Sequence, residues 1–245
     1  MDQSFGQSVD RFVAQKFFQL ERERASHIET LRLVPLLRGN NPYLARLRQR
    51  GLASDIVNWL LDFGSAGFQE TLFDDFLREL AIFVSQEKCN GRKSSTEGLD
   101  IELERDGVRY LIAVKSGKAW GNATQHKKLR ENFKAAVRVL RQNKAVGEIQ
   151  PTLGICYGRF KTVNDGAVLK IGGQSFWELI SGEPELYMDI IEPIGHRAKE
   201  FNEAFEVNRG KAENRMVREF TERFCRVDGS IDWPKIVTLV SHNAA

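Results

Sequence analysis

The sequence of 245 residues lacks the features that mark several protein classes. It has no run of about 18 consecutive apolar residues, which excludes a hydrophobic membrane-spanning helix. Its first residues, 1–4, do not show the basic and then apolar pattern of a signal peptide, so we expect a cytoplasmic protein. The net charge of +3 is too small to name a partner, and a hydrophobic content of 42% excludes a disordered chain.

Histidine and cysteine are also scarce and scattered. The three cysteines have no metal-ligand spacing, and we expect them to be buried, reduced thiols. The four histidines form no HxH or HExxH pattern, which argues against a zinc site. No GxxxxGK[ST] motif is present, so ATP hydrolysis at a phosphate-binding loop is excluded.

The small net charge conceals an uneven distribution along the chain. Residues 11–50 contain nine basic side chains and three acids, and residues 115–144 contain nine basic side chains and one acid. Residues 178–206 reverse this balance, with eight acids and two basic residues. Such a distribution is typical of a protein that binds a polyanion with one face, although amphipathic helices with solvated basic faces produce the same pattern.

The hydrophobic periodicity predicts a mixed α/β fold in which a small sheet is flanked by helices. Asp106 and Gly107 form a strong signal for a two-residue hairpin turn between two strands. The strands are expected at 99–104, 108–114, 151–157 and 167–171. The helices are expected within 10–63, at 67–87 with Ser65 as cap, at 125–142, 175–180, 184–191, 194–208 and 211–225, and from 233.

No linker composition divides the chain, so we expect one domain over residues 1–245. It would consist of a helical N-terminal region, an α/β core and a helical C-terminal region, at residues 1–66, 67–175 and 176–245.

The predicted hairpin gathers charged side chains on one face. A two-residue turn makes paired residue numbers sum to 213, so Asp100 lies opposite Ala113. Lys115 and Glu102 each lie two residues further along their strands and therefore share that face. A carboxylate at a strand end can hold Mg²⁺ against a phosphate, and a neighbouring lysine can stabilise the charge that develops on it. The alternative is an exposed acidic strand face with a solvated lysine at its end.

The segment 97–125, EGLDIELERDGVRYLIAVKSGKAWGNATQ, resembles the core of the PD-(D/E)XK nucleases, and in particular the PmeII-like group of type II restriction endonucleases. Further similar motifs cover most of the chain: NPYL at 41–44, GICYGR at 154–159, GGQSFWELISG at 172–182, DIIEPIG at 189–195 and FC-x-x-DG-x-IDW at 224–233. The resemblance implies a restriction-endonuclease-like fold and Mg²⁺-dependent cleavage of double-stranded DNA at a specific sequence. It also implies a homodimer, because both strands of a duplex must be cut.

Transferred by position, the resemblance makes Asp100 the metal-binding aspartate and Lys115 the signature lysine. The chain departs from the pattern at Ala113, where an acid is expected two residues before the lysine. The second metal carboxylate must then come from elsewhere. The candidates, in order of preference, are Glu102, Glu79, Glu131 and Glu70.

Several polar and basic residues around this segment are predicted to contact DNA. Backbone contacts are expected from the loop before the hairpin and from the basic face of the helix at 125–142, and base contacts from amide side chains. Trp120 has the alternative of packing on the sheet. The predicted DNA-binding residues are Lys93, Ser94, Ser95, Ser116, Lys118, Trp120, Asn122, Gln125, Lys127, Lys128 and Arg130.

Two other functions stay open at this point. The alanine at position 113 is also compatible with a non-catalytic DNA-binding or interaction module whose nuclease site has degenerated. A structure-specific DNA repair nuclease would use the same core.

Overall fold

The computed structural model describes residues 2–48, 51–142, 147–159 and 161–242. Residues 49–50 and 143–146 lie outside this set. They include Arg50 and Lys144, the last basic residues of the stretches 11–50 and 115–144. The chain divides into two compact units. The sheet unit comprises Met1–Lys16 and Phe73–His196, and the helical unit comprises Phe17–Leu72 and Arg197–Ala245.

A six-stranded mixed sheet forms the centre of the sheet unit, in the order β1-β2-β3-β4-β6-β5. Strands β1, β2 and β3 are antiparallel, β3, β4 and β6 are parallel, and β5 is antiparallel to β6. This confirms the expected α/β class. The strands are β1 (Arg92–Lys93), β2 (Ile101–Arg105), β3 (Val108–Gly117), β4 (Glu148–Tyr157), β5 (Val163–Asn164) and β6 (Leu169–Gly172).

The β2–β3 hairpin has the predicted turn and register. Asp106 and Gly107 both have positive φ, 53° and 77°, as a two-residue turn with the twist of the flanking strands requires. Ile101 pairs with Ile112, so paired residue numbers sum to 213. The register is therefore confirmed, and it fixes which residues share a face.

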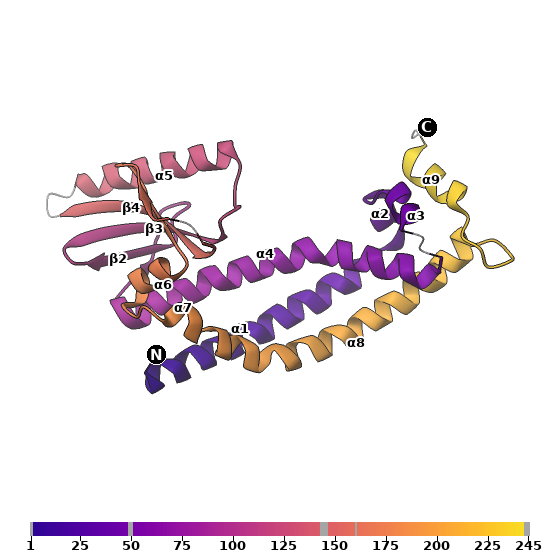
Figure 1. The fold of residues 1–245 in the computed structure, drawn as a ribbon, viewed down its shortest axis with the longest axis horizontal. Helices are drawn as coiled ribbons and strands as arrows, with labels where there is room; N and C mark the ends of the chain where they lie inside the picture. Colours follow the sequence, from indigo (N-terminus) through magenta and orange to yellow (C-terminus); the bar gives the residue numbers. More distant parts are fainter. Residues whose placement is uncertain (1, 49–50, 143–146, 160, 243–245) are drawn as a thin grey trace. The chain divides into compact units, whose positions relative to one another are not determined.

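Helices cover both faces of this sheet (Figure 1). On one face, α5 (Ala123–Arg141) buries Leu129, Phe133 and Ala136 against residues of β3 and β4. On the other, α6 (Gln174–Ser181) places the ring of Phe176 against Gly154, where a Cβ atom would lie 2.3 Å from the ring. Only glycine permits this close approach. The helix that the sequence predicts at 175–180 is thus present as α6.

The helical unit has its own apolar core. Its buried side chains come from five helices and include Ile28, Leu60 and Phe220. Three long helices, α1, α4 and α8, contribute residues to both units. The helices are α1 (Gln3–Thr30), α2 (Leu33–Arg38), α3 (Pro42–Leu47), α4 (Ala53–Cys89), α7 (Leu186–Asp189), α8 (Ile191–Phe224) and α9 (Trp233–Ser241).

Two predicted helix boundaries are wrong. Ser65 does not cap a helix but lies inside α4. Its hydroxyl donates to the carbonyl of Leu61 at 2.6 Å and therefore has its hydrogen-bond partner within the same helix. The interruption expected between 208 and 211 is also absent, because α8 continues through it. There Arg209 forms an ion pair with Asp62 at 2.7 Å.

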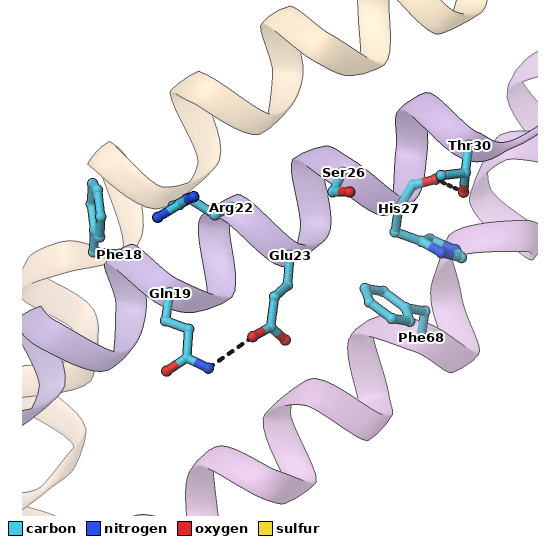
Figure 2. A pocket seen from close by; sticks show the side chains of 8 residues that line it. All are labelled: Phe18, Gln19, Arg22, Glu23, Ser26, His27, Thr30 and Phe68. Carbon is cyan, nitrogen blue, oxygen red and sulfur yellow. Dashed lines mark hydrogen bonds between the residues drawn. The ribbon is translucent and has the colours of Figure 1, made fainter.

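The three cysteines are free thiols, but only Cys156 is buried, and the other two are partly exposed. No helix within the described part of the chain combines the length and the apolar character that crossing a bilayer requires. A pocket of about 660 Å³ opens in the helical unit, where the rings of His27 and Phe68 stack at 4.0 Å (Figure 2). None of the predicted site residues lines it.

Candidate active site

Asp100 lies where β2 begins and β3 extends beyond it. Its N–H donates to the carbonyl of Ile112 at 2.8 Å, which continues the antiparallel ladder by one residue. The N–H of Val114 then donates to Oδ2 of Asp100 at 2.7 Å. The carboxylate of Asp100 therefore accepts the hydrogen bond that a backbone carbonyl of the neighbouring strand would otherwise accept. This bond fixes the carboxylate at this edge of the sheet.

The Asp100 carboxyl group is a buried acid with several cations around it. Its side chain is only 17% exposed, and Nε of Arg78 lies 3.8 Å from Oδ1. Burial raises the pKa of Asp100 above its usual value, while the Val114 hydrogen bond and the charges of Arg78, Lys115 and Lys93 act in the opposite direction. A metal ion beside Asp100 would add to these positive charges and favour the ionised carboxylate, which is the form that binds metal.

Lys115 lies two residues beyond Ala113 on β3 and pairs with Ile155 of β4. Its Nζ is 4.9 Å from the centroid of the Trp120 ring, and its charge acts on the Asp100 carboxyl group. The structure therefore brings together the predicted aspartate and the predicted lysine.

Glu102, the first candidate for the second carboxylate, is held by other residues. Its Oε2 accepts from Arg92 at 2.6 Å and its Oε1 accepts from Ser94 at 2.9 Å. Burial acts to raise the pKa of Glu102, but the hydrogen bonds from Arg92 and Ser94 outweigh it and hold the pKa below its usual value. Both carboxylate oxygens of Glu102 thus already accept hydrogen bonds from neighbouring side chains.

The other three candidates differ in their surroundings. Glu79 forms an ion pair with Lys16 at 2.5 Å. Glu131 is exposed on α5, and Glu70 belongs to the helical unit. Within the described residues, no group of three or more His, Cys, Asp or Glu side chains is gathered closely enough to hold an ion.

Asp74 is a candidate that the sequence reasoning missed. It precedes Arg78 by four residues on α4, so the two lie on the same helix face. Burial raises the pKa of the Cys156 thiol at the end of β4, and the charges of Asp74 and Asp100 raise it further. Both carboxylates therefore lie near the same thiol. The helical spacing of Asp74 and Arg78 was the available signal, but nothing in the sequence tells that this turn of α4 faces Asp100.

The predicted DNA contacts around the site have varied surroundings. Lys93 lies on β1, and Ser94 is occupied with Glu102. Asn122 and Gln125 form the capping box of α5, with Gln125 Oε1 accepting from Asn122 N–H at 2.8 Å, so the oxygens of both amides are engaged. The remaining predicted contacts that are exposed are Ser95, Lys118, Lys127, Lys128 and Arg130, and Ser116 is half-buried.

The basic face of α5 begins at the same sheet edge as Lys115, because α5 follows the end of β3. Its residues Lys127, Lys128 and Arg130 are all exposed. However, Lys128 forms an ion pair with Glu97 at 3.1 Å and Arg130 one with Asp165 at 2.7 Å, whereas Lys127 forms none with the described residues. The Arg130 guanidinium and two backbone N–H groups lower the pKa of Asp165 to about 2. Lys127 is thus the best placed of the three to meet a phosphate beside the site.

Comparison with protein families identifies a match over most of the chain. The family model described as type II restriction endonuclease EcoO109I matches residues 7–202. This match spans the predicted metal site and most of the chain. A search of curated proteins finds no significant match.

Proposed function

Because this chain belongs to the type II restriction endonuclease family of EcoO109I, an enzyme family that cleaves double-stranded DNA at specific sequences, we propose that the sheet edge at Asp100 and Lys115 is its active site. The family match confirms the prediction of a type II restriction endonuclease. The sequence motifs themselves resemble the PmeII-like group of these enzymes. The observation that supports the proposal is the convergence of a buried carboxylate and a lysine at the end of β3.

The proposed reaction is hydrolysis of a phosphodiester bond, with water as nucleophile and a sugar oxygen as leaving group. Asp100, fixed by Val114 N–H, would hold Mg²⁺ beside the scissile phosphate. When bound, the ion would neutralise charge on the phosphate oxygens and favour deprotonation of water. The Lys115 ammonium group donates a hydrogen bond to the phosphate and stabilises the additional negative charge of the pentavalent transition state.

The direct test is incubation of the purified chain with phage DNA, with Mg²⁺ and with excess chelator. We expect discrete fragments with Mg²⁺ and intact DNA with chelator. DNA that is bound but stays intact with every divalent metal tried would instead support the non-catalytic binding module that Ala113 suggests.

A comparison of carboxylate variants tests which residue completes the metal site. We expect Asp74→Asn to lower the cleavage rate by about 100-fold or more. Asp74 would be the second metal ligand, and the loss of a metal ligand weakens transition-state stabilisation by several kcal/mol. Glu79→Gln and Glu102→Gln should change the rate much less, because Lys16 and Arg92 already engage those carboxylates. The opposite order, with Glu102→Gln inactive and Asp74→Asn active, would assign the second ligand to Glu102 as the sequence predicts.

The basic face of α5 should contribute salt-dependent affinity beside the site. We expect Lys127→Gln to weaken binding to all DNA sequences alike and to reduce the slope of log K against log salt by about 0.9, the effect of one phosphate contact. Lys235→Gln is the matched control, because Lys235 is an exposed lysine of α9 that belongs to the helical unit and to none of the predicted DNA contacts. Fluorescence anisotropy at several salt concentrations measures both slopes.

We further propose that the enzyme acts in the cytoplasm as a homodimer, with one sheet edge for each strand of the duplex. A two-fold dimer would match a palindromic site. Sedimentation of the DNA complex should then report two chains per duplex.

A further inference from the structure

The indole ring of Trp120 lies against the side chain of Lys115, the lysine of the proposed active site. The Lys115 Nζ lies 4.9 Å from the centroid of the Trp120 ring, within the range of a cation–π interaction. The ring in turn lies against His126 of α5, with centroids 4.5 Å apart and planes tilted by 52°. Trp120 also packs against the apolar cluster between α5 and the sheet.

We propose that Trp120 is a positioning residue that presents the Lys115 ammonium group to the scissile phosphate beside Asp100. The inference rests on the proposed active site and adds a residue to it. A lysine side chain has four rotatable bonds, and its ammonium group is useful only if held where negative charge develops. The indole ring supplies a surface of negative potential that favours one position of this group without occupying any of its hydrogen-bond donors.

A purely structural role does not explain why this residue is tryptophan. Its indole Nε1 is buried and has no hydrogen-bond partner among the described residues. A buried, unsatisfied N–H group is unfavourable, and a phenylalanine would fill much of the same space without it. The larger ring of tryptophan, however, gives the strongest interaction with a cation.

This role also differs from the DNA contact that the sequence predicts for Trp120. A residue that stacks on DNA contributes to affinity, whereas a residue that acts through Lys115 contributes to the rate of the chemical step. The turn that carries it is fixed independently of DNA, because the Asn122–Gln125 capping box closes the start of α5.

The test compares wild-type protein with Trp120→Phe and Trp120→Leu in two measurements. Single-turnover cleavage with Mg²⁺ reports the chemical step, and DNA affinity in Ca²⁺ reports binding. We expect the cleavage rate to fall by about 3-fold in the phenylalanine variant and by about 10-fold or more in the leucine variant, in line with loss of a cation–π interaction. DNA affinity should stay within about twofold.

Trp233→Phe is the matched control. Trp233 also lies near a cation, with the Arg46 guanidinium 5.5 Å from its ring, but belongs to the helical unit. We expect it to cleave DNA at the wild-type rate. Thermal unfolding checks that each variant is folded, and the phenylalanine variant carries the test if the leucine variant is not.

Two results would overturn the inference alone: Trp120 variants that cleave as fast as the wild type, or variants that lose affinity while the rate of the chemical step is unchanged. The second result would return Trp120 to the predicted DNA contacts. A wild-type chain that cleaves no DNA would overturn the proposed active site itself, and the two failures are therefore distinguishable.

Discussion

Asp100→Asn should abolish DNA cleavage, with a fall of about 1,000-fold or more, while the protein stays folded and binds DNA. The expected loss is large because asparagine removes the charge that would hold the metal, and metal ions stabilise phosphoryl-transfer transition states by several kcal/mol. The fold should survive, because the asparagine carbonyl oxygen can still accept the hydrogen bond from Val114 N–H. Single-turnover cleavage and DNA affinity in Ca²⁺ measure the two effects.

The same substitution makes a prediction about stability and pH. Burial raises the pKa of Asp100, so the native state binds this proton more tightly than the unfolded state does. The contribution of this group to the free energy of unfolding is therefore largest below its unfolded pKa and is lost as the pH rises through its folded pKa. Asp100→Asn removes this dependence, and we expect the variant to be as stable as the wild type at pH 7, or more stable.

Asp106→Asn is the matched control for both measurements. It makes the same chemical change at the turn of the same hairpin, where the side chain is 90% exposed and asparagine tolerates the positive φ of 53°. We expect full activity and unchanged stability. Divalent cations should raise the unfolding temperature of the wild type and of Asp106→Asn but not of Asp100→Asn. An active Asp100→Asn variant would contradict the assignment of the metal site.

Lys115→Ala should have the second largest effect, a fall in the cleavage rate of about 100- to 1,000-fold. The reason is the loss of a fixed positive charge next to the pentavalent phosphate, and one such donor in a catalytic site contributes about 3–4 kcal/mol. Lys115→Arg should restore little activity, because the planar guanidinium group cannot occupy the position of the compact ammonium group. Single-turnover rates for the three proteins at saturating enzyme concentration measure this effect.

Lys170→Ala provides the comparison for Lys115→Ala. Lys170 is also a half-buried lysine on a strand of this sheet, where it pairs with Leu153. We expect it to cleave at the wild-type rate. Equal losses in the two lysine variants would indicate a general weakening of the sheet and would remove Lys115 from the active site.

The hairpin that carries Asp100 and Lys115 could be predicted because its information is local. The turn type follows from Asp106 and Gly107, and the turn fixes every pair of β2 and β3. The helix boundaries failed for an equally physical reason. A serine within a helix can bond back to its own turn, so Ser65 carries the signature of a cap without being one.

The proposal of Asp74 as second carboxylate could not come from the sequence, because it depends on tertiary packing. Glu102 shares the correct face of the hairpin, but the short strand β1 brings Arg92 beside it, and nothing in the sequence predicts β1. Likewise, the approach of Arg78 to Asp100 depends on which turn of α4 lies at the sheet edge. The position of Asp74, four residues before Arg78 on α4, depends on the same packing.

We propose that this chain cuts both strands of DNA at one sequence with the site at Asp100 and Lys115. Sequencing the ends of all fragments that the wild-type protein produces from phage DNA with Mg²⁺ tests it most directly. We predict that every end lies at a fixed position relative to one short sequence, and that Lys115→Ala produces no ends. Ends scattered over unrelated sequences, or ends confined to branched DNA, would contradict a site-specific restriction endonuclease.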